Sequence, residues 1–234
     1  MTEANVVKEA AASGSRIRGI HLTFAAPTVI ELLARHVDFI YLDGEHGCFD
    51  WRDVEAACIT AERYGLTTIA RVPDNSAPTI TRYLDRGVRG VVVPHIETIA
   101  DAKVAVEAAY YAPLGHRSFG GSRPAYLDIA DKPAHLKKSN AATSICLMIE
   151  SKAGLDAIDK LAAVEGIDYL SFGMMDLAHS LGHAGDPGHA DVKNAVADAT
   201  KRVHAAGKRV REDFMHFAWI NELILAGAKQ LLAA

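Results

Sequence analysis

The sequence predicts an α/β protein of the (β/α)8, or TIM, barrel class, and two observations support this prediction. Eight short apolar runs alternate with helix-like segments, and most runs are continuous, as in strands that are covered on both faces. The polar residues after successive runs also recur at a near-constant interval: His46, Arg71 and His95 are separated by 25 and 24 residues. That interval suits one strand, one helix and two short loops. The expected strands are Ile17–Phe24, Phe39–Leu42, Thr67–Val72, Gly90–Pro94, Ile145–Ile149, Tyr169–Phe172, Arg209–Arg211 and Gln230–Leu232.

Three segments modify the regular pattern. Residues Glu3–Ala12 are expected to form a short helix that closes the bottom of the barrel. The long segment Ala112–Thr143 is expected to be an active-site lid or a subunit contact. Because the chain ends directly after the predicted strand Gln230–Leu232, the barrel is expected to lack the usual C-terminal eighth helix. Residues 1–234 would then form a single barrel domain with a bare outer face that another copy covers, which predicts a homo-oligomer.

Composition and charge restrict the classes of function. Half of the 234 residues are hydrophobic, so the chain can bury a sizeable core. The net charge of −4 and the pI of about 6.2 give no basic surface for nucleic acid. No apolar run approaches the roughly 18–20 residues of a membrane span, and the N-terminal residues lack the pattern of a signal peptide. The three cysteines show no CxxC spacing, so we expect reduced thiols in a cytoplasmic protein.

Polar side chains follow several of the predicted strands. Because parallel strands of a barrel end on the same rim, these side chains should converge on one mouth. A cation, a histidine and several acids at one mouth indicate a catalytic site more strongly than any one of them alone. The residues are Asp43, Glu45 and His46 after the second strand, Arg71 after the third, Glu150 after the fifth and Asp176 after the sixth.

Glu150 and Asp176 are the candidate metal ligands. They lie 26 residues apart, on either side of a helical pattern over Ala153–Val164, so they belong to one βαβ unit. Two hard oxygen ligands suit Mg²⁺ or Mn²⁺, and Co²⁺ is also compatible, whereas zinc would recruit histidine or cysteine. The alternative is that both acids are solvated and cap the helices that follow them.

His46 and Arg71 are the candidate catalytic residues. Histidine is the side chain most often used for proton transfer near neutral pH, and Asp43 or Glu45 could orient its ring. Arg71 ends an apolar strand, where its guanidinium could stabilise a developing oxyanion. The alternatives are a structural histidine and a structural salt bridge from Arg71 to Glu45.

Two weaker patterns, one of histidines and one of glycines, do not predict a binding site. His179, His183 and His189 lie in a Gly- and Pro-rich loop and are expected to be loop histidines without a ligand role. The glycines at 115, 120 and 121 match neither GxGxxG nor a P-loop, so nucleotide binding is not predicted.

A series of short motifs between residues 16 and 211 resembles one family, in order and at compatible spacing. That family is the HpcH/HpaI-type class II pyruvate aldolases, typified by 4-hydroxy-2-oxoheptanedioate and 2-dehydro-3-deoxyglucarate aldolases. The motifs are Asp43-Gly-Glu-His-Gly47, Ala70-Arg-Val-Pro73, Leu84-Asp-Arg-Gly87, Val92-Val-Pro94, Tyr111-Ala-Pro-Leu-Gly115, Met148-Ile-Glu150, Asp176-Leu177 and Ser180-Leu-Gly-His183.

The resemblance implies a metal-dependent lyase that reversibly cleaves a 4-hydroxy-2-oxo acid to pyruvate and an aldehyde through a metal-stabilised enolate. Glu150 and Asp176 would hold the metal, and Arg71 would bind the keto oxygen. His46, supported by Asp43, would transfer the proton. Further roles implied are binding of the pyruvate carboxylate by Gly173 and the N–H groups of Met175 and Asp176, with Asp85 and Glu45 as supporting acids. The resemblance also implies a trimer or hexamer whose barrels exchange their last helix.

The chain departs from the family pattern at Gly173-Met-Met-Asp176, where the family has Gly-Pro-x-Asp, and in the loop Gly115-His-Arg-Ser-Phe-Gly-Gly-Ser122. The methionines are expected to reshape the pocket floor, and the loop leaves the aldehyde open. Two other functions stay open: a related metal–enolate lyase or oxaloacetate decarboxylase, and a non-catalytic barrel that binds a keto acid.

Overall fold

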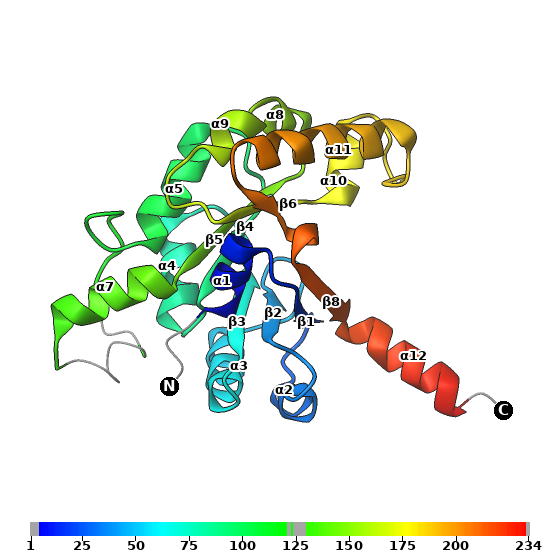
Figure 1. The fold of residues 1–234 in the computed structure, drawn as a ribbon. Helices are drawn as coiled ribbons and strands as arrows, with labels where there is room; N and C mark the ends of the chain where they lie inside the picture. The colour runs from blue at the N-terminus through cyan, green and yellow to red at the C-terminus, as the bar shows by residue number, and fades with distance from the viewer. Residues whose placement is uncertain (1–4, 121–122, 124–129, 233–234) are drawn as a thin grey trace.

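Eight parallel strands form one sheet in the computed structural model, which describes residues 5–120, 123 and 130–232. The order β7-β6-β5-β4-β3-β2-β1-β8 places each strand beside its predecessor except β8, which pairs with β1. The sheet curls around a filled interior (Figure 1). The strands are β1 Ile17–Leu22, β2 Phe39–Asp43, β3 Thr67–Arg71, β4 Gly90–Val93, β5 Ser144–Ile149, β6 Tyr169–Phe172, β7 Arg209–Val210 and β8 Met215–Trp219.

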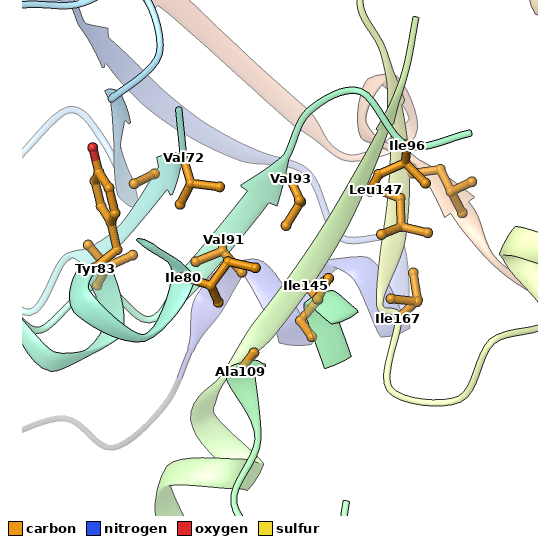
Figure 2. Close-up of a cluster of buried hydrophobic side chains, with 14 of the residues drawn as sticks. Val72, Ile80, Tyr83, Val91, Val93, Ile96, Ala109, Ile145, Leu147 and Ile167 are labelled. Carbon is orange, nitrogen blue, oxygen red and sulfur yellow. The ribbon is translucent and has the colours of Figure 1, made fainter. Parts of the chain in front are cut away.

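Both faces of strands β2 to β6 are buried, which explains why their sequences are largely apolar. On β2, Phe39 and Tyr41 face the interior of the curled sheet, whereas Ile40 and Leu42 face the helices. The interior cluster also takes a side chain from most other strands, for example Ile69, Val92 and Met148. Figure 2 shows part of the outer cluster, in which Val91 of β4 lies beside Ile80 of α4, and Leu147 of β5 lies beside Ile96.

The helices cover the outer face of the sheet, and short polar motifs start several of them. Asp50 and Asp53 form a capping box at the start of α3, and Thr98 and Asp101 form one at the start of α5. The single helix expected over Ala153–Val164 is broken in two at Ala157. The helices described are α1 Val6–Ser13, α2 Pro27–Leu33, α3 Trp51–Arg63, α4 Ala77–Asp85, α5 Ile99–Ala109, α7 Lys132–Ala142, α8 Lys152–Asp156, α9 Ile158–Ala162, α10 Met174–Ser180, α11 Ala190–Ala205 and α12 Ile220–Leu232.

Helix α1 closes the end of the sheet where the strands begin, as predicted. Its Val7, Ala10 and Ala11 join the interior cluster, and Asn5, its N-cap, also donates hydrogen bonds to Arg89 O and Ala142 O beside the starts of β4 and β5. The long segment 112–143 joins α5 to β5 and therefore belongs to this same end. Residues 121–122 and 124–129 of the segment lie outside the described part. The described part therefore lies away from the mouth of its own chain, and its role as a subunit contact stays a prediction.

The predicted eighth strand at Gln230–Leu232 is wrong, and so is the predicted absence of an eighth helix. The eighth strand is β8, Met215–Trp219, which pairs with β1 in register from Ile17↔Met215 to His21↔Trp219. Residues 230–232 are the last turn of α12. The short run Met-His-Phe-Ala-Trp alternates more than the other strands, and the longer apolar pattern after it hid it in the sequence.

Helix α12 projects away from the rest of the chain (Figure 1). Among its residues only Ile220 is buried, whereas Leu225 is 60% exposed and Leu231 and Leu232 are each 80% exposed. The expected bare apolar face therefore exists, but it belongs to the eighth helix itself and not to a gap left by a missing helix. In the described part of the chain, no helix is both long and apolar enough to cross a bilayer.

Candidate active site

The carboxyl ends of β2, β3, β5 and β6 form one mouth and carry most of the predicted site residues. The register pairs Asp43 with Arg71, so the ends of β2 and β3 present these two side chains next to each other. It also pairs Ile149 with Phe172, which brings Glu150 beside Gly173. The order of the strands thus gives the mouth two halves, an Asp43–Arg71 half and a Glu150–Asp176 half.

Arg71 is held by two carboxylates in the first half. Its Nε and Nη2 donate to Asp43 Oδ1 and Oδ2 at 3.0 and 2.7 Å, a two-point contact, and Nε also lies 3.1 Å from Glu45 Oε2. The predicted salt bridge to Glu45 is therefore present, together with a shorter one to Asp43. This arrangement fixes the guanidinium at the rim.

Asp43 is almost completely buried, yet it stays ionised. Burial alone would raise the pKa of Asp43, but His21, Arg71 and the backbone N–H of His46 outweigh burial and hold that pKa well below its usual range. Burial lowers the pKa of His21, whose Nε2 lies 3.4 Å from Asp43 Oδ2. The His21 ring also stacks on Trp219, the last residue of β8, at 3.8 Å between ring centroids. Asp43 is thus a buried carboxylate with its charge already compensated.

Glu150 has the opposite electrostatic environment. Its side chain is 3% exposed, and burial, together with the nearby carboxylates of Glu45 and Asp176, raises its pKa, while the backbone N–H and ring of His95 act in the other direction. A Cβ atom at Gly173 would lie 2.2 Å from Glu150 Oε2, so only glycine lets β6 end this close to the carboxylate. A buried acid beside two others is a site for a cation.

The residues from Gly173 to Asp176 form the start of α10. Gly173 is the N-cap and supplies no side-chain hydrogen bond, and Asp176 lies in the first turn. Met174 packs against the outer core, whereas Met175 is 57% exposed. Of the two methionines, only Met175 is therefore free to contact a bound molecule.

The His46 ring lies near Glu45 but not near Asp43, and Asp85 lies apart from the mouth. The ring of His46 is exposed at the mouth, with Nε2 3.8 Å from Glu45 Oε2, and Asp43 accepts only the backbone N–H of His46, at 3.1 Å. Asp85 ends α4, at the end of the sheet opposite the mouth, where it pairs with the buried Arg117 at 2.7 Å. Within one chain, Asp85 does not reach the other site residues.

His95 is a site residue that the sequence reasoning did not select. It follows β4, with Nδ1 3.0 Å from Glu150 Oε1 and Nε2 3.2 Å from Glu45 Oε1. It therefore joins the two halves of the mouth. The signal was present in the sequence, because His95 occupies the same strand-end position after β4 that selected Arg71 after β3.

Another group of possible metal ligands lies at the start of α11. His183, His189 and Asp191 place donor atoms within 4.8 Å of one another. The two rings stack face to face, with centroids 3.6 Å apart and an angle of 14° between their planes. Within this group, His189 Nδ1 accepts the N–H of Asp191, and His183 Nε2 lies 3.2 Å from Asp191 Oδ2. The predicted loop position is wrong for His179, which lies within α10, and the lack of a ligand role at His183 and His189 stays a prediction.

A comparison with protein families decides the relationship of the chain. Residues 19–223 match the family described as HpcH/HpaI aldolase/citrate lyase. The chain belongs to this family. The resemblance noted in the sequence motifs is thereby confirmed.

Similar proteins agree with the assignment to this family. A hydroxypyruvate/pyruvate aldolase from Roseovarius nubinhibens is 33% identical over 205 residues, which cover 87% of this chain and 80% of that protein. A 4-hydroxy-2-oxovalerate aldolase from Rhodococcus jostii is 34% identical over 87% of this chain and 79% of its own length. The crystal structure of a family member from Burkholderia cenocepacia superposes with a TM-score of 0.89, at 29% identity and 98% coverage of both chains.

Proposed function

We propose that the protein is a divalent-metal-dependent aldolase that reversibly cleaves a 4-hydroxy-2-oxo acid to pyruvate and an aldehyde. The observation that carries the proposal is the Glu150 half of the mouth. There a buried carboxylate with a raised pKa lies beside Asp176, and one strand, β4, separates β5 from the strand that ends in Arg71. Relatives named as aldolases of hydroxypyruvate, pyruvate and 4-hydroxy-2-oxovalerate support the choice of substrate class.

The donor chemistry of the mouth suits Mg²⁺ or Mn²⁺. Glu150 and Asp176 supply carboxylate oxygens, the ligands that these ions prefer, and Gly173 lets the start of α10 approach Glu150 closely. A divalent cation would compensate the charge that the protein leaves uncompensated at Glu150. When bound there, it would act as a Lewis acid toward the keto group of the substrate.

The side chains of the other half of the mouth can provide binding and proton transfer. Arg71 is pre-oriented by Asp43 and Glu45, so it can stabilise negative charge on a keto oxygen without reorganising. His46, exposed at the rim, can carry a proton between the substrate and solvent, and Glu45 is the nearest acid to its ring. The first turn of α10, with Gly173, Met175 and Asp176, offers backbone N–H groups to the substrate carboxylate.

For the fold and the assembly, we propose a closed (β/α)8 barrel in an oligomer that buries α12. Closure is supported by Phe214, just before β8, which packs against Tyr169 of β6 at 5.2 Å between ring centroids. Burial of α12 is supported by the exposed Leu223, Ile224 and Leu225 on the projecting helix. Light scattering should give the mass of a trimer or hexamer, and a chain mass of 25.1 kDa would contradict the proposal.

The test of the activity is proton exchange of pyruvate in D₂O. With Mg²⁺, the methyl proton signal of pyruvate should fall by NMR in the presence of the protein. The Glu150→Gln variant should abolish this loss, whereas Glu165→Gln, the same change at an exposed acid, should not. A methyl signal that persists with the wild-type protein and Mg²⁺ would overturn the proposal. Decarboxylation of oxaloacetate without cleavage of any hydroxy-oxo acid would reassign the site to a related lyase.

A further inference from the structure

His95 makes an unusual set of contacts with the acids of the mouth. Its backbone N–H donates to Glu150 Oε1 at 2.6 Å, and its ring Nδ1 lies 3.0 Å from the same oxygen. The other ring nitrogen, Nε2, lies 3.2 Å from Glu45 Oε1. His95 therefore contacts Glu150 Oε1 through both its backbone N–H and its ring, and the same ring also contacts Glu45.

The backbone of His95 is adapted to these contacts. Its φ of +55° is the one positive value among the non-glycine residues that the structure describes. A side chain in this left-handed region is disfavoured and persists where the surroundings require it. At His95, the left-handed turn after Pro94 brings the N–H and the ring to the same carboxylate oxygen.

The second oxygen of Glu150 has a different neighbour. Oε2 lies against Gly173, where a Cβ would come within 2.2 Å, and so faces the junction of β6 with α10. Asp176 is in the first turn of α10 and acts electrostatically on Glu150. The two oxygens of Glu150 are thus distinguished: Oε1 is held by His95, and Oε2 lies against Gly173, the N-cap of the helix that carries Asp176.

We propose that His95 is a positioning residue that fixes Glu150 with Oε2 as its metal-binding oxygen. It does so by holding Oε1 and by anchoring the pair to Glu45, which in turn lies 3.1 Å from Arg71. The inference rests on the proposed metal site at Glu150 and Asp176. A residue that orients a ligand from behind contributes to metal affinity without touching the ion.

Calorimetric titration of the metal-free protein with Mn²⁺ tests this role. His95→Gly keeps the positive φ and the backbone N–H but removes the ring, so it should weaken Mn²⁺ binding about 10- to 100-fold. His95→Asn tolerates the same backbone, and its amide nitrogen replaces Nδ1, so it should recover part of the affinity. The control is His36→Ala. His36 is an exposed histidine that precedes β2, at the end of the strand opposite the mouth, so this variant should bind Mn²⁺ as the wild type does.

The outcomes separate the two proposals. If the wild type binds Mn²⁺ and His95→Gly binds it within twofold of the wild type, the positioning role is overturned. An Asn variant no tighter than the Gly variant also overturns it, because the ring nitrogen would then carry no part of the effect. If the wild type binds no Mn²⁺ at all, the metal site itself is refuted. Urea unfolding of each metal-free variant checks that the fold is retained.

Discussion

Asp43 and Glu150 are two buried carboxylates at the same mouth, and their environments are opposite. Asp43 has Arg71, His21 and backbone N–H groups around it, and its pKa is held well below the usual range. Glu150 is buried beside two other acids, and these outweigh the opposing effect of His95, so its pKa is raised. The comparison shows how one protein can use a carboxylate in two ways. Asp43 is part of the framework that holds Arg71, whereas Glu150 is left undercompensated and is suited to bind a cation.

Removing the charge of Asp43 should have the largest effect on stability. Asp43→Asn leaves Arg71 without its two-point partner, and breaking a buried ion pair on one side costs about 3 to 5 kcal/mol. Urea unfolding should show this loss. Asp156→Asn, which breaks the exposed pair with Lys152, should change the free energy of unfolding by no more than about 0.5 kcal/mol. An equally small loss for Asp43→Asn would remove the contrast between the two mouth acids.

Glu150 and Asp43 should change the free energy of unfolding with pH in opposite directions, and we expect these changes to be smaller than the effect of Asp43→Asn. The pKa of Glu150 is raised in the folded state, so protonation of Glu150 stabilises the fold. This contribution to the free energy of unfolding is fully present below the usual pKa range of a glutamate and is lost as pH rises through the raised pKa. Its size is about 1.4 kcal/mol per unit of pKa shift. Because the pKa of Asp43 is depressed, its contribution is present above about pH 4 and is lost below that value.

Unfolding of the metal-free protein, measured from pH 8 down to pH 3, should therefore show stability that first rises and then falls. Glu150→Gln should flatten the rise and make the protein more stable than the wild type at neutral pH. A Glu150→Gln variant that is less stable than the wild type at neutral pH would mean that Glu150 is compensated within the chain, as Asp43 is.

The smallest effect on stability is expected at His46, which lies three residues after Asp43. Its ring is exposed, so His46→Gln should change the free energy of unfolding by less than about 0.5 kcal/mol. Proton exchange of pyruvate should nevertheless fall sharply if His46 transfers the proton. Unchanged exchange would assign the transfer to another group and restrict the functional part of this loop to Asp43 and Glu45.

The sequence predicted seven of the eight strands. For β2 to β6 the reason is that residues on both faces are buried and mostly apolar, a property that is visible without a structure. It failed at β8, where Met215, Phe217 and Trp219 alternate with His216 and Ala218 and the longer apolar pattern of α12 follows directly. A short strand beside a strongly amphipathic helix has too little sequence signal of its own. The error in the strand then produced the error about the eighth helix.

The position of the site could be predicted from the sequence, but the contacts among its side chains could not. Parallel strands carry their terminal residues to one rim, so Asp43, Arg71 and Glu150 follow from the order of the strands. Which acid contacts which cation depends on register and on single dihedral angles. The left-handed backbone of His95 and the short distance between Gly173 and Glu150 are three-dimensional properties, and no local pattern encodes them.

The stack of Trp219 on His21 has a consequence for spectroscopy. Trp219 is the residue from which α12 departs, and the His21 ring on which it lies is 3.4 Å from Asp43. The chain has one other tryptophan, Trp51 at the start of α3. In a Trp51→Phe background, Trp219 would be the single indole. Its fluorescence would thus report both the docking of α12 and the protonation of His21, without any added label.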